Sequence, residues 1–183
     1  MIYQLSYPSP LGLLTLQADD EALLNIEFPD VELPLREGVR IIAAEEDSQA
    51  LPLPLRETVN WLDSYFEGRQ PDEYPPMRPA GSPFRQEVWE RLCEIPFGEL
   101  LTYGELARMM AEARGIPRMA AQAVGGAVGA NPIPIIIPCH RVIGSNGSLT
   151  GYGGGVQFKV DLLEHEQVET RGFKWPKVKE EMI

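Results

Sequence analysis

A thiol and an imidazole stand side by side in the second half of the chain. Cys139 is followed directly by His140, and the pair comes after the apolar residues 133–137. A free cysteine is more often a buried core residue than a nucleophile. An acid–base neighbour, however, converts a thiol to the reactive thiolate, and Pro138 restricts how the chain enters the pair. The pattern leaves two interpretations open, an inert core cysteine and an activated nucleophile.

A histidine that acts as a base needs an acceptor that orients it. Glu166 is the candidate, near the end of a helix expected over about residues 157–167. The alternative is a solvated carboxylate at the end of that helix. Glycine-rich segments at 144–147 and 151–155 follow the cysteine and would let the backbone approach a ligand. These residues could supply a nucleophile, a base and an orienting group.

Composition narrows the setting of this chemistry. The chain has 183 residues with only two cysteines and two histidines, which is no disulfide framework and no apparent zinc-ligand set. We expect no metal and no cofactor. The first residues lack a basic segment before an apolar one, and no apolar run reaches the ~18 residues that span a bilayer. We therefore expect a cytoplasmic protein with no signal peptide and no membrane partner.

The acidic charge is concentrated in one part of the chain. The net charge of −11 argues at first against a nucleic-acid partner. Residues 1–81 carry 5 Lys and Arg against 15 Asp and Glu, whereas residues 103–143 carry four Arg against two Glu. The part that holds Cys139 is thus slightly basic, although phosphate neutralisation there would give only modest affinity.

The periodicity predicts an α+β protein of two lobes. Residues 1–78 form an N-terminal lobe, with strand-like runs at 2–5, 13–16 and 23–28 that suggest a small antiparallel sheet, followed by a helix over about 55–66. Prolines at 71, 75, 76 and 79 indicate a semi-rigid linker. Residues 79–183 form a mostly helical C-terminal lobe.

Two helices in the C-terminal lobe form a helix-turn-helix pattern. Thr102 and Glu105 match a capping box, Gly115 is a stop signal, and a further helix is expected from Arg118 to about Ala130. That last helix is made almost wholly of small residues. Such a composition fits tight packing, or a backbone that lies against a flat partner such as a DNA groove; each glycine costs a helix ~1 kcal/mol, which suggests a steric requirement.

Several motifs, in order along the chain, resemble the O6-alkylguanine-DNA alkyltransferases (methylated-DNA–protein-cysteine methyltransferases). The match runs from about residue 79 to 167, while the N-terminal lobe is similar only in size and pattern. The motifs are Ser82-Pro83-Phe84, Val88-Trp89, Ile95-Pro96-Phe97-Gly98, Thr102-Tyr103, Ala123-Val124-Gly125-Gly126-Ala127, Asn131-Pro132 with Pro138-Cys139-His140-Arg141-Val142, and Gly151-Tyr152 with Gly154-Gly155.

The resemblance implies an RNase H-like N-terminal lobe and a single-turnover reaction. The partner would be double-stranded DNA containing O6-alkylguanine. The protein would bind it as a monomer through the minor groove, with the damaged base flipped into a pocket. The Cys139 thiolate would attack the alkyl carbon, giving S-alkyl-cysteine and a repaired guanine.

The resemblance also assigns roles to residues. His140 would deprotonate Cys139 through a water, Glu166 would orient His140, Tyr103 would donate a proton to the leaving base, and Asn131 would join the helix-turn-helix to the active-site segment. The remaining assignments are a substrate pocket of Val142, Ser145, Tyr152 and Gly153, with the carbonyls of Cys139 and Val142 accepting from the guanine amino group, and a DNA contact surface of Arg118, Ala121, Gln122, Gly125, Gly126 and Arg141.

Two departures concern DNA binding. Gln122 stands where the family usually places an arginine, and the segment between Tyr103 and the recognition helix is about five residues longer than usual, which predicts a lengthened first helix through Arg114. Two other functions are compatible with the sequence. One is a non-catalytic lesion sensor, which would not need the thiol. The other is a Cys–His–Glu hydrolase or acyltransferase that turns over.

Overall fold

The computed structural model describes residues 1–183 except 30, 32–37, 44–47, 151, 153–154 and 177–183. The chain forms two compact units. The first comprises Met1–Gln86 and Asn131–Ile137, and the second comprises Glu87–Ala130 and Pro138–Ile183. Within the described residues, no helix is long and apolar enough to cross a membrane.

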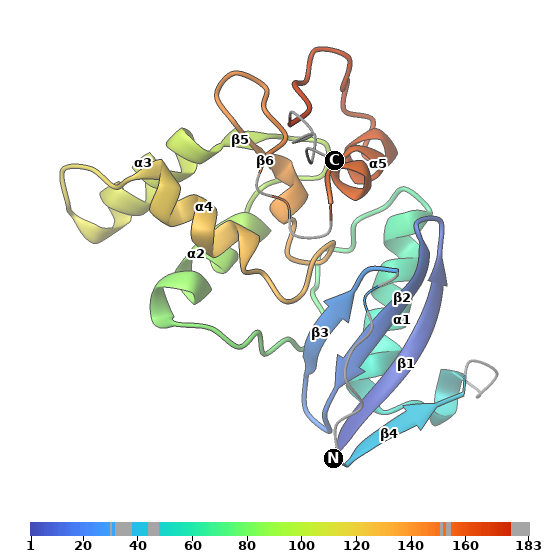
Figure 1. Ribbon diagram of the computed structural model, residues 1–183. Helices are drawn as coiled ribbons and strands as arrows, with labels where there is room; N and C mark the ends of the chain where they lie inside the picture. The colour runs from blue at the N-terminus through green and yellow to red at the C-terminus, as the bar shows by residue number, and fades with distance from the viewer. Residues whose placement is uncertain (30, 32–37, 44–47, 151, 153–154, 177–183) are drawn as a thin grey trace, which may run out of the picture. The chain divides into compact units, whose positions relative to one another are not determined.

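A four-stranded sheet dominates the first unit (Figure 1). Strands β1 (Ile2–Ser9), β2 (Gly12–Ala18) and β3 (Leu23–Glu27) form the predicted antiparallel meander. The fourth strand, β4 (Val39–Ile42), lies beside β1 and runs parallel to it, giving the order β3-β2-β1-β4. The sheet is therefore mixed rather than wholly antiparallel, because the chain crosses over between β3 and β4 instead of making a hairpin.

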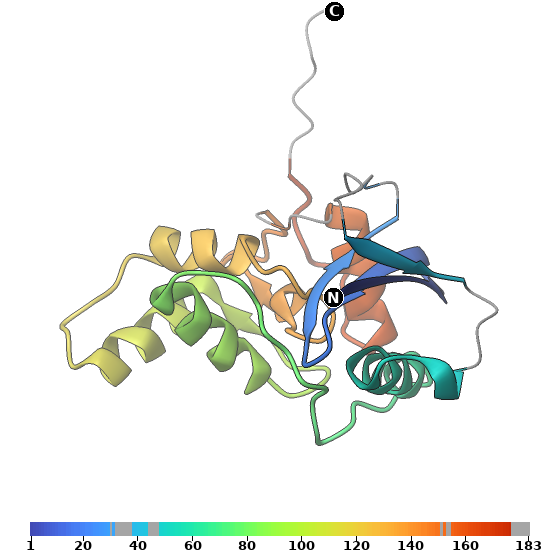
Figure 2. The same ribbon diagram turned by 90° about the horizontal axis from the view of Figure 1, so that it is seen from below.

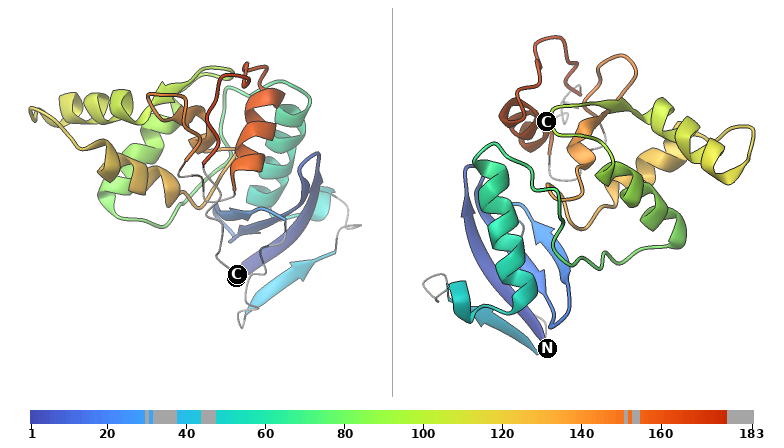
Figure 3. Two further views of the ribbon diagram at one scale, coloured as in Figure 1. Left: turned by 45° about the horizontal axis from the view of Figure 1, so that its top comes forward. Right: turned by 180° about the vertical axis from the view of Figure 1, so that it is seen from behind.

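Helix α1 (Leu53–Phe66) covers one face of this sheet, as Figures 2 and 3 show. Alternation along β2 explains the arrangement, because Leu14, Leu16 and Ala18 are fully buried while the residues between them are not. A short 3-10 helix, η1 (Ser48–Ala50), precedes α1. From α1, Leu55 and Leu62 complete the core at 0% exposure.

The proline-rich segment after α1 is attached to the sheet. The backbone N–H of Leu23 donates to the Pro76 carbonyl at 2.8 Å, and that of Arg78 donates to the Leu23 carbonyl at 2.9 Å. The Arg78 side chain also pairs with Asp19 and with Glu21. This part of the expected linker thus follows the edge strand β3 as an extended segment.

The predicted helix-turn-helix lies in the second unit and consists of α3 (Tyr103–Arg114) and α4 (Ala121–Gly129). Helix α2 (Pro83–Cys93), whose first turn belongs to the first unit, precedes it. The capping box at the start of α3 is present, with Thr102 and Glu105 bonded reciprocally, and Gly115 ends the helix at φ +65°. Helix α3 does run to Arg114. Helix α4, however, begins at Ala121 rather than Arg118, because Ala120 has an extended backbone at the N-cap.

The segment that contains the thiol continues from this motif. A short helix, η2 (Cys139–Arg141), leads into β6 (Val142–Ile143), which pairs in parallel with β5 (Leu101–Thr102) just before α3. Helix α5 (Val156–His165) closes the unit through an apolar cluster of Ile143, Leu149, Val160 and Leu163. Strand pairing therefore holds the thiol segment beside the start of the helix-turn-helix.

Candidate active site

The short helix η2 presents Cys139 from a buried backbone. Its N-cap, Pro138, has φ −81° and ψ 64°, which turns the chain sharply before the thiol. Cys139 is 5% exposed, and the two residues after it, His140 and Arg141, are fully buried. A thiol in this position is protected from bulk water while remaining next to polar groups, so burial alone does not make it an inert core residue.

Glu166 is the centre of a buried hydrogen-bond network. It lies at the C-cap of α5 and is 3% exposed. One carboxylate oxygen lies 2.6 Å from His140 Nε2, and the other accepts from the Gly98 backbone N–H at 3.0 Å. Arg141 donates to both oxygens at 2.9 Å. The sequence-based pairing of His140 with Glu166 is thus present in the geometry, and the carboxylate is not solvated.

The same contacts set the charges of the pair. Burial by itself would raise the pKa of Glu166, but the hydrogen bond from His140 and the hydrogen bonds and positive charge of Arg141 hold that pKa well below its usual range. Burial lowers the pKa of His140, against the opposing effect of Glu166. The site therefore contains an ionised carboxylate and a neutral imidazole, whose Nε2–H donates to Glu166.

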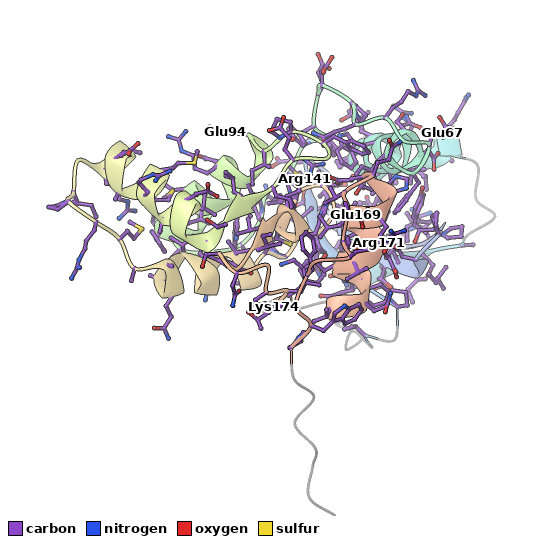
Figure 4. All side chains as sticks on the ribbon, turned by 90° about the horizontal axis from the view of Figure 1, so that it is seen from above. Glu67, Glu94, Arg141, Glu169, Arg171 and Lys174 are labelled. Atoms are coloured by element: carbon purple, nitrogen blue, oxygen red, sulfur yellow. The ribbon has the colours of Figure 1, made fainter. Side chains whose placement is uncertain are left out.

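The position of Arg141 overturns one sequence-based expectation. Its guanidinium was expected at DNA, but it is fully buried, and besides Glu166 it donates to the Ile95 carbonyl at 2.5 Å and lies 5.8 Å from the Phe97 ring centroid. Figure 4 places Arg141 among packed side chains, whereas Glu94 lies at the periphery. A guanidinium enclosed in this way cannot reach a phosphate; it holds both oxygens of Glu166 instead.

Tyr103, the first residue of α3, is the second expected site residue that the structure brings to the thiol. Its hydroxyl donates to the Thr150 carbonyl at 3.1 Å. Burial, together with the negative charge of Cys139, raises the pKa of Tyr103 to about 12. The phenol therefore keeps its proton at neutral pH and can act as a donor close to the thiol.

Lys159 is a site residue that the sequence analysis missed. It lies on α5, is fully buried, and its Nζ donates to the Val142 carbonyl at 2.5 Å. Nζ also lies 5.8 Å from the ring centroids of both Tyr103 and Tyr152. The only signal in the sequence is the position of this lysine, three residues after Val156 and one before Val160, on the apolar side of a predicted helix. A lysine would normally be expected on the polar side.

The remaining residues expected in the substrate pocket differ in how deeply they are buried. Val142 is fully buried, Tyr152 is half-buried near Lys159, and Ser145 is exposed in the turn where the Gly144 N–H donates to the Ser148 carbonyl at 2.8 Å. Gly153 lies outside the described residues. The structure thus places Val142 and Tyr152 beside the same ammonium group, and Ser145 at the surface.

Asn131 organises the segment that precedes the thiol. Its side-chain amide donates to the Ile137 carbonyl at 2.8 Å and its oxygen accepts from the Ile133 N–H at 2.9 Å, so one residue ties both ends of the 131–137 loop. The loop contains Ile135 at φ +74°, a left-handed conformation that is costly for a β-branched residue. Asn131 helps to hold this strained loop.

Helix α4 has one buried and one open face. Val124, Ala127 and Val128 are buried, and the Ala127 carbonyl accepts from the Trp89 indole at 2.8 Å. The Gly125 backbone packs beside the Tyr103 ring, whereas Gly126 has open space in front of it. The exposed residues are Ala121, Gln122, Ala123, Gly126 and Gly129, with Arg118 exposed just before the helix. This small-residue face is suited to close approach by a flat partner.

A thiol, a neutral imidazole, an ionised carboxylate and a phenol thus lie in one unit that also carries a helix-turn-helix. Within the part of the chain that the structure describes, no group of three or more His, Cys, Asp or Glu side chains could hold a metal ion. The fold and the site together define a protein that combines a helix-turn-helix motif with a buried cysteine beside a histidine–glutamate pair.

Comparison with known proteins identifies the family. Residues 83–168 match the DNA binding domain of 6-O-methylguanine DNA methyltransferase, and residues 2–73 match its ribonuclease-like domain. The chain belongs to this family, the methylated-DNA–protein-cysteine methyltransferases, which confirms the resemblance and the predicted fold class.

Individual relatives agree over nearly the whole chain. The methylated-DNA–protein-cysteine methyltransferase of Haemophilus influenzae is 38% identical over 91% of this chain and 87% of its own length. The crystal structure of Mycobacterium tuberculosis O6-methylguanine methyltransferase is 38% identical, covers 91% of this chain and 93% of its own, and has a TM-score of 0.74. The Mycobacterium tuberculosis protein OGT in complex with DNA gives 38% identity, 90% and 92% coverage, and a TM-score of 0.71.

Proposed function

We propose that this protein repairs O6-alkylguanine in DNA by transferring the alkyl group to its own Cys139, once per molecule. In terms of reaction class it is a methylated-DNA–[protein]-cysteine S-methyltransferase. The observation that carries the proposal is the buried contact of 2.6 Å between His140 and Glu166. His140 is the residue directly after Cys139. Such a pair has the chemistry required to activate a cysteine.

Activation of Cys139 would use the second nitrogen of His140. With Nε2–H donating to Glu166, Nδ1 of the neutral imidazole is an acceptor, and within the described residues it is buried and has no hydrogen-bond partner. A water held there would pass the thiol proton to His140. The thiolate is a soft nucleophile suited to displacement at an alkyl carbon.

The leaving guanine needs a proton. As the carbon–oxygen bond breaks, its electron pair passes to the base, and a donor near the ring nitrogen lowers the barrier. Tyr103, with a pKa of about 12, would supply that proton, and solvent would restore it. Tyr152 would wall the pocket together with Val142, and Ser145 would lie at its mouth. The expected contribution of the Gly153 N–H falls on a residue outside the described part.

DNA would lie against the exposed face of α4. Its small side chains, Ala121 and Gly126 among them, would allow close approach to the minor groove, and Gln122 would fill the gap left by the flipped base. The Gly125 backbone would contribute beside Tyr103. Arg118 is exposed, and within the described residues no hydrogen bond or ion pair engages its guanidinium, so it would contact a phosphate.

Other expectations complete the proposal. Asn131 would stabilise the connection between the helix-turn-helix and the thiol segment. A domain boundary near residues 78 and 79, action as a monomer in the cytoplasm, and a reaction without metal or cofactor remain parts of this proposal that further work can test.

Intact-mass measurement tests the proposed function. After incubation with a duplex carrying O6-methylguanine, we expect the gain of one methyl group on Cys139 and none on Cys139→Ser. Both variants should bind the duplex. Binding without any mass gain would support a lesion sensor and overturn the proposal. Continued release of product beyond one equivalent would instead indicate a turnover hydrolase or acyltransferase.

Gln122 offers a test of the DNA face. Gln122→Arg adds one charge at an exposed position of α4, and we expect it to strengthen duplex binding by ~1 kcal/mol with a steeper salt dependence. Glu90→Gln, an exposed change of equal charge on α2, serves as the control. If both variants strengthen binding equally, Gln122 does not face the DNA.

A further inference from the structure

Lys159 is a buried cation for which the proposed mechanism has no use. Its side chain is fully buried on α5, in the same unit as Cys139. A buried ammonium is costly unless a counter-charge and hydrogen bonds compensate it. Lysine is among the residues least often fully buried without a partner. Its position therefore calls for an identified counter-ion.

The groups that contact Lys159 in the described part of the chain carry no negative charge. Nζ donates to the carbonyl of Val142, a neutral acceptor three residues after Cys139, and lies 5.8 Å from two aromatic rings, Tyr103 on α3 and Tyr152 after β6. Within the described residues, no carboxylate forms an ion pair with it. Tyr103 is protonated, and His140, whose own pKa Lys159 helps to lower, is neutral.

The remaining candidate is Cys139, which carries a negative charge when it is ionised to the thiolate that the proposed function requires. Burial lowers the pKa of Lys159 to about 8, and the negative charge on Cys139 is the group that opposes this fall. The same charge acts on Tyr103, one of the two rings that face Nζ. Geometry supports the same link, because Val142, whose carbonyl accepts from Nζ, donates its own N–H to the Cys139 carbonyl. Lys159 is thus bonded to the buried turn that carries the thiol, where opposite charges stabilise each other more strongly than in water.

We propose that Lys159 is the counter-charge of the Cys139 thiolate, and that alkyl transfer leaves its buried ammonium without a counter-ion. This inference rests on Cys139 being the alkyl acceptor. The Cys139 sulfur forms a bond to the alkyl carbon, the bond from that carbon to guanine O6 breaks, and the electron pair leaves with the base. The guanine takes up one proton. The neutral thioether that remains cannot balance Lys159.

Two consequences follow from this single coupling. Before the reaction, Lys159 favours the thiolate and thereby raises the fraction of reactive protein. After the reaction, the pKa of Lys159 falls, so the ammonium tends to release a proton that balances the one taken up by guanine. Lys159 is thus a positioning residue for charge rather than a group that touches the substrate.

Reciprocity gives the inference a sharp test. When two groups interact, each shifts the other's titration by the same free energy. The rise in the Cys139 thiol pKa on neutralising Lys159 should therefore equal the fall in the Lys159 pKa when Cys139 changes from thiolate to methyl thioether. Either half of this equality can be measured separately.

The experiment uses nuclear magnetic resonance of the full chain with labelled cysteine and lysine. The sequence has only two cysteines and four lysines, 159, 174, 177 and 179, so the signals are few. Titration of the thiol in wild type, Lys159→Met and the exposed control Lys174→Met should raise the Cys139 pKa in Lys159→Met alone. An unchanged Cys139 pKa in a folded Lys159→Met protein would overturn the proposal.

A second measurement needs no variant at position 159. The Lys159 pKa is followed in wild-type protein before and after methylation by a duplex containing O6-methylguanine, with intact mass confirming the modification. We expect the pKa to fall on methylation while the other lysines do not change. A Lys159 pKa that stays constant refutes the inference but leaves alkyl transfer established. Absence of methylation would refute the proposed function, while the thiol titration would still test the charge pair.

Discussion

The second unit buries two cations, Arg141 and Lys159, and gives them different partners. Arg141 donates to both oxygens of an ionised carboxylate, Glu166, and also to the Ile95 carbonyl. Lys159 donates to the Val142 carbonyl and faces two aromatic rings. One cation is compensated by a permanent charge, whereas the compensation of the other depends on the ionisation of a thiol.

This difference distinguishes a pair that serves the structure, Arg141 and Glu166, from a cation whose surroundings change in the reaction, Lys159. The Arg141–Glu166 pair has the same charge before and after any reaction at Cys139, so it can fix His140 throughout. The environment of Lys159 changes when the thiolate is consumed. A protein that uses its cysteine once can tolerate such a change, because it need not restore the starting state.

Removing the permanent charge should have the largest effect. Glu166→Gln leaves the Arg141 guanidinium buried without a carboxylate, and breaking one side of a buried pair typically costs about 3–5 kcal/mol. We expect that loss in urea unfolding, together with loss of methyl transfer because His140 is no longer oriented. The control is Glu169→Gln, whose exposed carboxylate pairs with the Arg171 side chain at 3.6 Å and accepts from the Arg171 backbone N–H at 3.1 Å. Comparable losses in both variants would show that burial of the network is not what matters.

The contributions of Glu166 and Lys159 to the free energy of unfolding should also change with pH, that of Glu166 at acidic pH and that of Lys159 at basic pH. The folded-state pKa of Glu166 is depressed, so its contribution to stability is complete above the unfolded pKa of about 4.3 and is lost as the pH falls below it. The pKa of Lys159 is lowered from 10.5 to about 8, so the unfolded chain binds more protons between these values, and stability should rise with pH across that window.

The Lys159 window can be isolated by difference. The free energy of unfolding of wild type minus that of Lys159→Met cancels the titration of other groups, and we expect this difference to increase by up to about 3 kcal/mol from pH 8 to 10.5. A flat difference would mean that Lys159 keeps its ordinary pKa in the folded protein, so that burial does not penalise the ammonium, and the contrast with Arg141 would disappear.

Much of this arrangement could be predicted from local sequence signals. The capping box at Thr102, the stop at Gly115 and the adjacency of Cys139 and His140 depend on neighbours within a few residues, and the structure has each of the two helix signals in place. Glu166 was predicted from the need of a histidine for an acceptor, although it lies 26 residues away along the chain.

The predictions that failed were those that depend on contacts between residues far apart in the sequence. The family resemblance places Arg141 on the DNA contact surface, and nothing local in the sequence shows that Glu166, at the end of α5, reaches its guanidinium. Lys159 was not singled out at all, since its burial depends on packing against η2 and α3. The expected start of α4 at Arg118 is three residues early, because Ala120 has an extended backbone and is the N-cap.

At neutral pH, Lys159→Met should change stability much less than Glu166→Gln does. The substitution removes a costly buried charge and fills similar volume with an apolar chain, but it leaves the Val142 carbonyl without its donor, and such opposing effects of about 1–3 kcal/mol nearly cancel. We expect a net change within about 1 kcal/mol in urea unfolding. A loss as large as that of Glu166→Gln would show that the two cations are equivalent structural elements.

The smallest effect on stability is expected from substitution of Phe97, whose ring lies beside the Arg141 guanidinium. Phe97→Leu removes the contact of 5.8 Å between the Arg141 guanidinium and the Phe97 ring, which is worth about 0.5–1 kcal/mol. Arg141 keeps its bonds to Glu166 and Ile95, so the guanidinium, and with it His140, should stay in place. Unfolding should therefore show a small loss while the rate of methyl transfer stays that of wild type. A tenfold or greater fall in rate, about 1.4 kcal/mol in the barrier, would mean that the ring, and not the carboxylate alone, orients the network.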